Sequence, residues 1–190
     1  MIGKVHKAAK KSMKIIKDDG MIGFGKRATK YAYYRKFPER KQKYYKDILF
    51  INGCTLPHPE RYRVAHQMEQ LMSQGLTSVF YDRLSLDDLK YYRGFVFFRC
   101  PVTETVREFI KQAKFFNKTC FFDIDDLVID QTYTDGIKYV QQMNQADKQL
   151  YDDGVNRMRE TLKLCDHVVT TTTQLRDELQ KYTTGDVLIN

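Results

Sequence analysis

Three carboxylates follow a short apolar run in the second half of the chain. Residues 119–122 (Thr-Cys-Phe-Phe) favour a buried β-strand, and Asp123, Asp125 and Asp126 come directly after it. Acids this close repel one another, so we expect some to be hydrogen-bonded, shifted in pKa or neutralised by a cation or base. In a parallel α/β sheet such residues lie where ligand-binding loops begin. A ligand site is one interpretation, and a solvated turn, where Asp is common, is the other.

The familiar catalytic and phosphate-binding motifs are absent from the sequence. There is no GxGxxG, no GxxxxGK[ST], no Ser elbow and no HExxH. With four histidines, a histidine-rich metal site is not expected. His58 lies in a strand-to-helix loop, where it either faces a ligand or is an ordinary loop residue. The four cysteines show no CxxC spacing, and we expect reduced thiols in or near strands.

The elements that must position the acids alternate between strand and helix from residue 47 onward. Strands are expected at residues 48–51, 78–81, 95–98, 119–122, 168–169 and 186–189. Helices are expected at 60–74, 86–92, 103–116, 135–146 and 152–164, with a further helix capped by Thr173. This alternation predicts an α/β fold for residues 47–190, a Rossmann-like parallel sheet flanked by helices.

Residues 1–46 form a basic amphipathic helical arm in this interpretation. They carry fifteen Lys and Arg against three acids, a balance of +12, which leaves −4 for the rest of a chain whose total is +8. Basic side chains interleaved with Tyr and Phe are typical of segments that bind an anionic membrane surface. Packing of the arm on its own domain and nucleic-acid binding are the alternatives. The expected membrane-binding residues are Lys4, Lys7, Lys11, Lys14, Arg27, Lys30, Arg35 and Lys36.

The order of landmarks from residue 47 to 190 resembles the N-terminal domain of a GT-B glycosyltransferase, in the branch that builds bacterial rhamnan and other cell-surface polysaccharides. The segments that carry the resemblance are Ile-Asn-Gly-Cys at 51–54, Glu-Arg-Tyr-Arg-Val at 60–64, Phe-Arg-Cys-Pro at 98–101, Phe-Asp-Ile-Asp-Asp-Leu at 122–127 and the stretch 165–175, with further matches at 68–75 and 113–118. Each segment is unspecific alone, and their order and spacing carry the comparison.

The resemblance implies an acceptor-binding domain, with the nucleotide-sugar donor held mainly by a second domain that this sequence does not contain. No cofactor is implied. The acceptor would be a lipid-linked glycan, and the enzyme would be cytoplasmic and peripheral at the inner face of the cell membrane. Asp123, Asp125 or Asp126 would deprotonate or position the acceptor hydroxyl. The other expected substrate-binding residues are Asn52, Gly53, His58, Tyr62, Arg63, Arg99, Thr171 and Thr172.

Several alternatives stay open at this point. Arg63 and Arg99 would either fork onto a phosphate or neutralise the acids as structural salt bridges. Residues 121–127 also resemble the motif of haloacid-dehalogenase-like phosphatases, with Asp123 as nucleophile and Asp125 as acid/base, but their downstream Lys and second acidic pair are missing. The DxD motif of GT-A glycosyltransferases fits less well, because residues 48–58 differ from their donor-binding loop. A non-catalytic adaptor is the remaining alternative.

Overall fold

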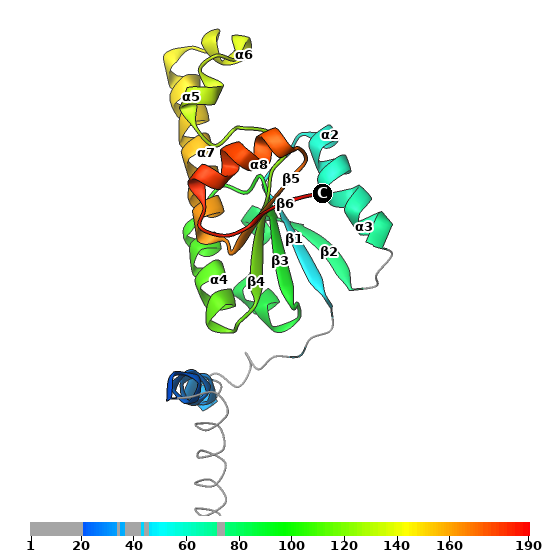
Figure 1. Cartoon of the computed structure of the whole chain (residues 1–190), viewed down its shortest axis with the longest axis vertical. Helices are drawn as coiled ribbons and strands as arrows, with labels where there is room; N and C mark the ends of the chain where they lie inside the picture. The colour runs from blue at the N-terminus through cyan, green and yellow to red at the C-terminus, as the bar shows by residue number, and fades with distance from the viewer. Residues whose placement is uncertain (1–20, 34, 37–42, 44–45, 72–74) are drawn as a thin grey trace, which may run out of the picture. The chain divides into compact units, whose positions relative to one another are not determined.

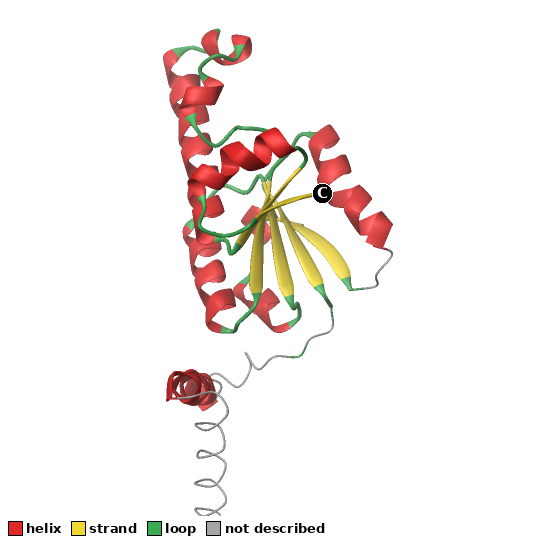
Figure 2. Cartoon of the chain, in the orientation of Figure 1, coloured by secondary structure: helices red, strands yellow, loops and turns green. Residues whose placement is uncertain are grey.

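The computed structural model describes residues 21–190, except 34, 37–42, 44–45 and 72–74 (Figures 1 and 2). The chain divides into two compact units, Met1–Lys41 and Gln42–Asn190. In the first unit, the described residues 21–33 and 35–36 form a helix. Lys4, Lys7, Lys11 and Lys14 lie outside the described residues, so their expected role is a prediction that the structure does not address.

The second unit is built on a six-stranded parallel sheet, which confirms the α/β, Rossmann-like architecture (Figure 2). Its spatial order is β2-β1-β3-β4-β5-β6. The chain therefore adds β2 on one side of β1 and then adds β3 to β6 in sequence on the other side. The change of direction lies between β1 and β3, where ligands commonly bind in open α/β sheets. The strands are β1 (Ile48–Asn52), β2 (Leu76–Phe80), β3 (Gly94–Phe98), β4 (Thr119–Asp123), β5 (His167–Thr170) and β6 (Val187–Ile189).

Helices connect these strands on both faces (Figure 1). They are α2 (Pro57–Glu60), a π-helical stretch (Arg61–Ala65), α3 (His66–Leu71), α4 (Glu104–Phe115), α5 (Gln131–Thr134), α6 (Lys138–Gln141), α7 (Gln145–Leu164) and α8 (Thr173–Leu179). Short 3-10 helices cover Tyr81–Arg83, Leu86–Lys90 and Gln180–Tyr182. Because α2, the π-helical stretch and α3 follow one another without a break, we refer to them together as the 57–71 helical segment.

The two faces of the sheet are packed differently. One face forms the larger core, in which α4, α7 and α8 cover the strands and Phe95 meets Phe109 edge to face at 4.7 Å. On the other face, the 57–71 helical segment packs Val64 against Phe50 and Phe98. Farther along this second face, towards β6, Leu188 is 46% exposed. The 57–71 helical segment therefore covers the β1 side of this face, and the site described below lies under it.

Local signals in the sequence account for the helix starts. The Thr103 hydroxyl accepts a hydrogen bond from the Val106 amide at 3.1 Å, as expected for the cap of α4. Ser85 and Asp88 form the expected capping box. The four cysteines are buried and free, which agrees with the prediction of reduced thiols.

Several expectations differ from the structure. Residues 145–164 form the single helix α7, where a helix was expected only from 152, and the helix expected at 135–146 is limited to α6. The cap of α8 is Thr172, whose hydroxyl accepts from the Leu175 amide, and not Thr173. The first helix begins at Pro57, three residues early, and Leu71, expected to point inward, is 57% exposed. Asp123 belongs to β4 itself and does not follow it.

Candidate functional site

A transverse row of residues crosses the sheet near its carboxyl edge. In the strand register, Asn52 of β1 lies beside Phe98 of β3, and Phe98 lies beside Asp123 of β4. Side chains alternate between faces along a strand, and register partners in a parallel sheet share a face. Because Phe98 packs with Val64, this row faces the 57–71 helical segment. Asp123 is thereby placed beneath a helix and not on the open rim.

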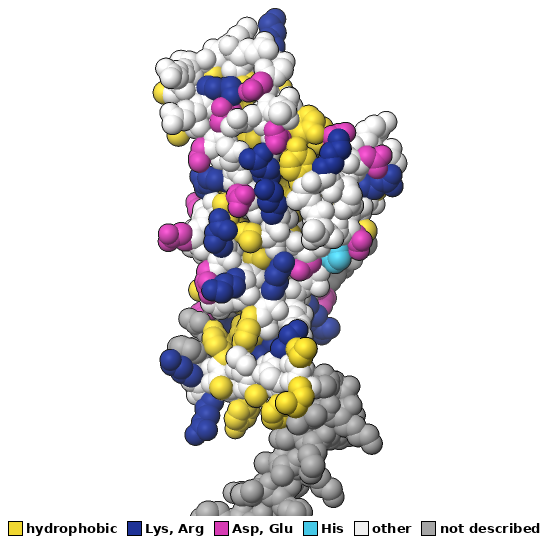
Figure 3. All heavy atoms as spheres, turned by 60° about the vertical axis from the view of Figure 1, so that its left-hand side comes forward, with side chains coloured by type: hydrophobic (Ala, Val, Ile, Leu, Met, Phe, Trp, Pro, Cys, Tyr) yellow, Lys and Arg dark blue, Asp and Glu magenta, His cyan; other side chains and the backbone are white. Residues whose placement is uncertain are grey.

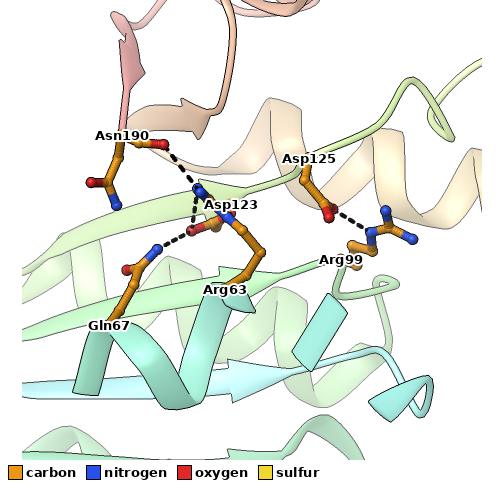
Figure 4. A network of polar contacts seen from close by, with 6 residues as sticks. All are labelled: Arg63, Gln67, Arg99, Asp123, Asp125 and Asn190. Carbon is orange, nitrogen blue, oxygen red and sulfur yellow. Dashed lines mark hydrogen bonds and ion pairs between the residues drawn. The ribbon is translucent and has the colours of Figure 1, made fainter. Parts of the chain in front are cut away.

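Asp123 forms a buried ion pair with Arg63 (Figure 4). Arg63 donates from Nε to one carboxylate oxygen at 2.9 Å and from Nη2 to the other at 3.0 Å. Gln67 Nε2 donates to the same carboxylate at 3.3 Å. The third Arg63 nitrogen, Nη1, donates to the Asn190 carbonyl at 3.2 Å. The exposed fraction is 8% for the Arg63 side chain and 1% for that of Asp123, so this pair is the structural salt bridge considered above.

Burial dominates the protonation of this carboxyl group. Desolvation raises the pKa of Asp123 to about 6, although the attraction and hydrogen bonds of Arg63 and the hydrogen bond of Gln67 act in the opposite direction. The ion pair is therefore present at neutral pH and is lost when the solution is acidified through that pKa. With both oxygens engaged and almost no exposure, Asp123 is not placed to meet a substrate directly.

A second ion pair lies at the rim, between Arg99 and Asp125. Arg99 Nε donates to Asp125 at 2.7 Å, and the exposed fractions of the two side chains are 14% and 21%. Arg99 has a backbone φ of 40°, which is strained for a residue with a side chain. Its amide donates to the Asp123 carbonyl at 3.0 Å, which fixes the loop after β3 against the end of β4. Figure 4 shows both pairs at neighbouring strand ends.

The third acid, Asp126, is exposed. One of its oxygens accepts from the Leu127 amide at 2.8 Å. Burial, followed by the negative charge of Asp126, raises the pKa of Tyr151 on α7, while the charge of Arg99 acts in the opposite direction. The rim therefore brings together a carboxylate, a guanidinium and a phenol from three separate segments.

Gly53 and Asn52 shape the switch point between β1 and β3. A Cβ at Gly53 would overlap the Arg99 carbonyl oxygen and the Cys100 Cα, so only glycine allows these two loops to approach. The Gly53 amide donates to the Phe98 carbonyl at 2.9 Å. Asn52 is 3% exposed, and its Oδ1 accepts from the Cys54 amide at 2.9 Å. The loops after β1 and β3 are therefore held together by direct contact between their backbones.

The remaining sequence-predicted residues are dispersed. His58 and Tyr62 are exposed on the outer part of the 57–71 helical segment, and the Tyr62 ring meets His66 at 5.2 Å. The Thr172 hydroxyl is engaged as a helix cap, and Thr171 precedes it in a bend. These four residues do not join the Arg63–Asp123 cluster.

Two neighbours of the acids were not expected from the sequence. Gln67 lies four residues after Arg63, one helical turn away on the same face, and this i,i+4 spacing is a signal that could have identified it. Tyr151 carries no comparable signal, because it lies in the part of α7 that was expected to be loop.

No protein-family model matches the chain, and no curated protein matches it.

Proposed function

We propose that this chain is the acceptor-binding part of a glycosyltransferase, acting at an anionic membrane surface. The reaction would move a sugar from a nucleotide-sugar to a lipid-linked glycan during cell-surface polysaccharide synthesis. The observation that carries the proposal is the convergence of acids and arginines at the ends of β3 and β4, in a parallel sheet of the expected topology. The donor nucleotide would be held by a second domain outside this sequence.

The geometry divides the three acids between two roles. Asp126 is exposed and Asp125 lies at the rim, so these two are the candidates for the base that takes the proton of the acceptor hydroxyl. Arg99 beside them is suited to a phosphate oxygen of the donor or of the lipid-linked acceptor. Asp123 acts through Arg63 as a positioning residue, because its oxygens are engaged by Arg63 and Gln67.

The same assignment weakens the phosphatase alternative. In that mechanism Asp123 would be the nucleophile, and a nucleophile needs an approachable oxygen. Asp123 is 1% exposed, and Arg63 donates to both of its oxygens. The carboxylate that this motif requires to attack phosphorus is the one that the fold has enclosed.

The helix of the described residues 21–33 and 35–36 supports the membrane part of the proposal. Met21, Ile22 and Tyr31 are each more than 70% exposed, and the same helix carries Arg27 and Lys30. In the space-filling view, hydrophobic and basic side chains lie side by side on this helix (Figure 3). Among the described residues, no helix is long and apolar enough to cross a bilayer. A helix of this kind would lie in the interface, with its bases near anionic headgroups.

Co-sedimentation with vesicles tests the proposal. Vesicles of phosphatidylcholine and phosphatidylglycerol, with or without a polyprenyl-diphosphate-linked saccharide, are mixed with the chain. We expect the saccharide lipid to increase binding, and Arg99→Gln to abolish that increase. Equal binding to both vesicle types would refute the acceptor role and favour the adaptor.

A second experiment tests the membrane-binding helix. The double variant Arg27→Gln/Lys30→Gln should weaken binding to anionic vesicles roughly fivefold per residue, whereas the control Lys111→Gln/Lys163→Gln, at two exposed lysines outside this helix, should not.

A further inference from the structure

A small pocket lies on the β2 side of the 57–71 helical segment. It has a volume of about 200 Å³. Its lining residues are Asn52, Glu60, Ser78, Val79, Phe80 and Arg83. A neighbouring hollow of about 330 Å³ shares Glu60 and Ser78 with it and extends along the same helical segment. The pocket therefore opens at the carboxyl ends of β1 and β2, beside the buried ion pair and separate from it.

The strand register explains why these side chains meet. Asn52 is the register partner of Phe80 across β1 and β2, so the two side chains share a face of the sheet. Two residues earlier, Phe50 is paired with Ser78, and Phe50 packs against Val64 of the helical segment. The pocket is thus bounded by the sheet below and by the helical segment at its side.

Asn52 supplies an unused donor to this pocket. Asn52 is 3% exposed, and its Oδ1 already accepts a hydrogen bond from the Cys54 amide. Within the described part of the chain, its Nδ2 has no hydrogen-bond partner. Because Asn52 lines the pocket, this amide group can donate to a suitable acceptor on a bound ligand.

The other groups define the chemistry of the ligand. Glu60 accepts hydrogen bonds and Arg83 donates them, and neither forms an ion pair or side-chain hydrogen bond with another described residue. Their charges cancel, which favours an uncharged ligand. Phe80 is 43% exposed and offers an apolar ring face at the same place. A ligand with hydroxyl groups around its edge and an apolar face matches this combination.

The volume sets the size of the ligand. Sites for drug-sized molecules usually occupy about 300–1,000 Å³, so a pocket of about 200 Å³ takes a single ring and not a nucleotide. We infer that this pocket is a subsite for one uncharged pyranose ring of the acceptor glycan, an inference that rests on the proposed function. Phe80 would stack on the ring, and Asn52, Glu60 and Arg83 would bind its hydroxyls.

Titration of the isotope-labelled full chain, followed by amide NMR, tests this inference. The ligands are a panel of methyl pyranosides, with uridine and inorganic phosphate as comparison ligands. We expect at least one pyranoside to shift the amides of Asn52, Phe80 and Arg83. Phe80→Ala and Glu60→Gln should each weaken that binding by roughly tenfold. Tyr139→Ala, which removes an exposed aromatic ring on α6, should leave it unchanged.

The alternative outcomes separate the two proposals. Shifts that centre on Arg99 and Asp125 and survive Phe80→Ala would overturn the pocket and leave the proposed function standing. Shifts at Asn52 with uridine or phosphate, but with no pyranoside, would overturn the assignment to a sugar. If no pyranoside binds while the saccharide lipid still increases vesicle binding, the pocket alone is refuted. If neither occurs, both proposals fail.

Discussion

Replacing Arg63 with methionine tests the energetic role of the buried ion pair. The substitution keeps much of the apolar stem and removes every hydrogen bond that the guanidinium donates to Asp123 and Asn190. Removing one partner of a buried pair costs about 3–5 kcal/mol, because Asp123 must then either stay buried as an uncompensated charge or take up a proton and lose its hydrogen bonds to Arg63. We expect a loss of that size in the free energy of unfolding at pH 7.

The loss should depend on pH in a direction that follows from the pKa of Asp123. In the wild-type fold this pKa is raised from 3.8 to about 6. The folded state therefore binds more protons than the unfolded state between these values, and this group lowers stability as the pH rises from about 4 to about 6. Arg63→Met removes the attraction that keeps the pKa from rising further. Above pH 6, Asp123 is ionised in the wild-type fold but stays protonated in the variant, so the stability difference between the two proteins grows by about 1.4 kcal/mol per pH unit. The loss of stability should therefore be about 1 kcal/mol smaller at pH 5 than at pH 7.

Urea unfolding followed by far-UV circular dichroism measures both effects. The chain has 13 Tyr and no Trp, so tyrosine fluorescence supplies a second probe. The m-value should stay constant, which shows that the substitution changes stability and not the extent of unfolding. The double variant Arg63→Met/Asp123→Leu, which removes both charges, should recover most of the loss.

Arg61→Met is the matched control. Arg61 lies in the same helical segment and pairs with Glu69 at 2.7 Å, but the side chains are 53% and 58% exposed. An exposed pair contributes at most about 1 kcal/mol. If Arg63→Met costs no more than Arg61→Met, or if its effect does not change between pH 5 and pH 7, the account of a buried, desolvated pair is wrong.

Substitutions at three further positions test the backbone and cap arguments by the same unfolding measurement. Gly53→Ala should lose about 3 kcal/mol, because the new methyl group would overlap the backbone at Arg99; a loss below 1 kcal/mol would contradict the close approach. Asn117 has a φ of 54° after the end of α4, so Asn117→Gly should stabilise slightly and Asn117→Ala should destabilise by about 1 kcal/mol; equal effects would rule out the strain. Thr103→Ala should cost about 1 kcal/mol, whereas Thr103→Ser should keep the cap.

The sheet could be predicted from the sequence because its strands are short apolar runs separated by helix signals. The first and last residues of the helices were harder to predict from the sequence. The first turns of α7 carry few apolar residues, and this part is supported by the Asn144 cap and by Lys148, which pairs with Asp152 at 2.6 Å. The cap of α8 was misplaced by one residue, since any member of the run from Thr171 to Thr173 has the required hydroxyl. Such choices depend on packing that periodicity does not encode.

The candidate site was predicted as a set of residue types, while its pairing was not. Arg63 and Asp123 were both named, but whether the arginine binds a ligand or the acid depends on a contact across 60 residues of sequence. Asp123 is buried because it is the last residue of β4 and lies under a helix, whereas the sequence had placed it in the loop that follows the strand. The pocket at Phe80 depends on strand register, which a single strand does not reveal.

The contacts that Arg63 forms with residues distant in sequence also bear on the order in which parts of the protein fold. Its guanidinium contacts acceptors 60 and 127 residues later in the chain. During synthesis on a ribosome, this cation emerges long before β4 and β6 exist, and closing loops of that length is slow compared with forming local helices. The 57–71 helical segment should therefore settle onto the sheet among the last events, with its charge hydrated until the far strands arrive.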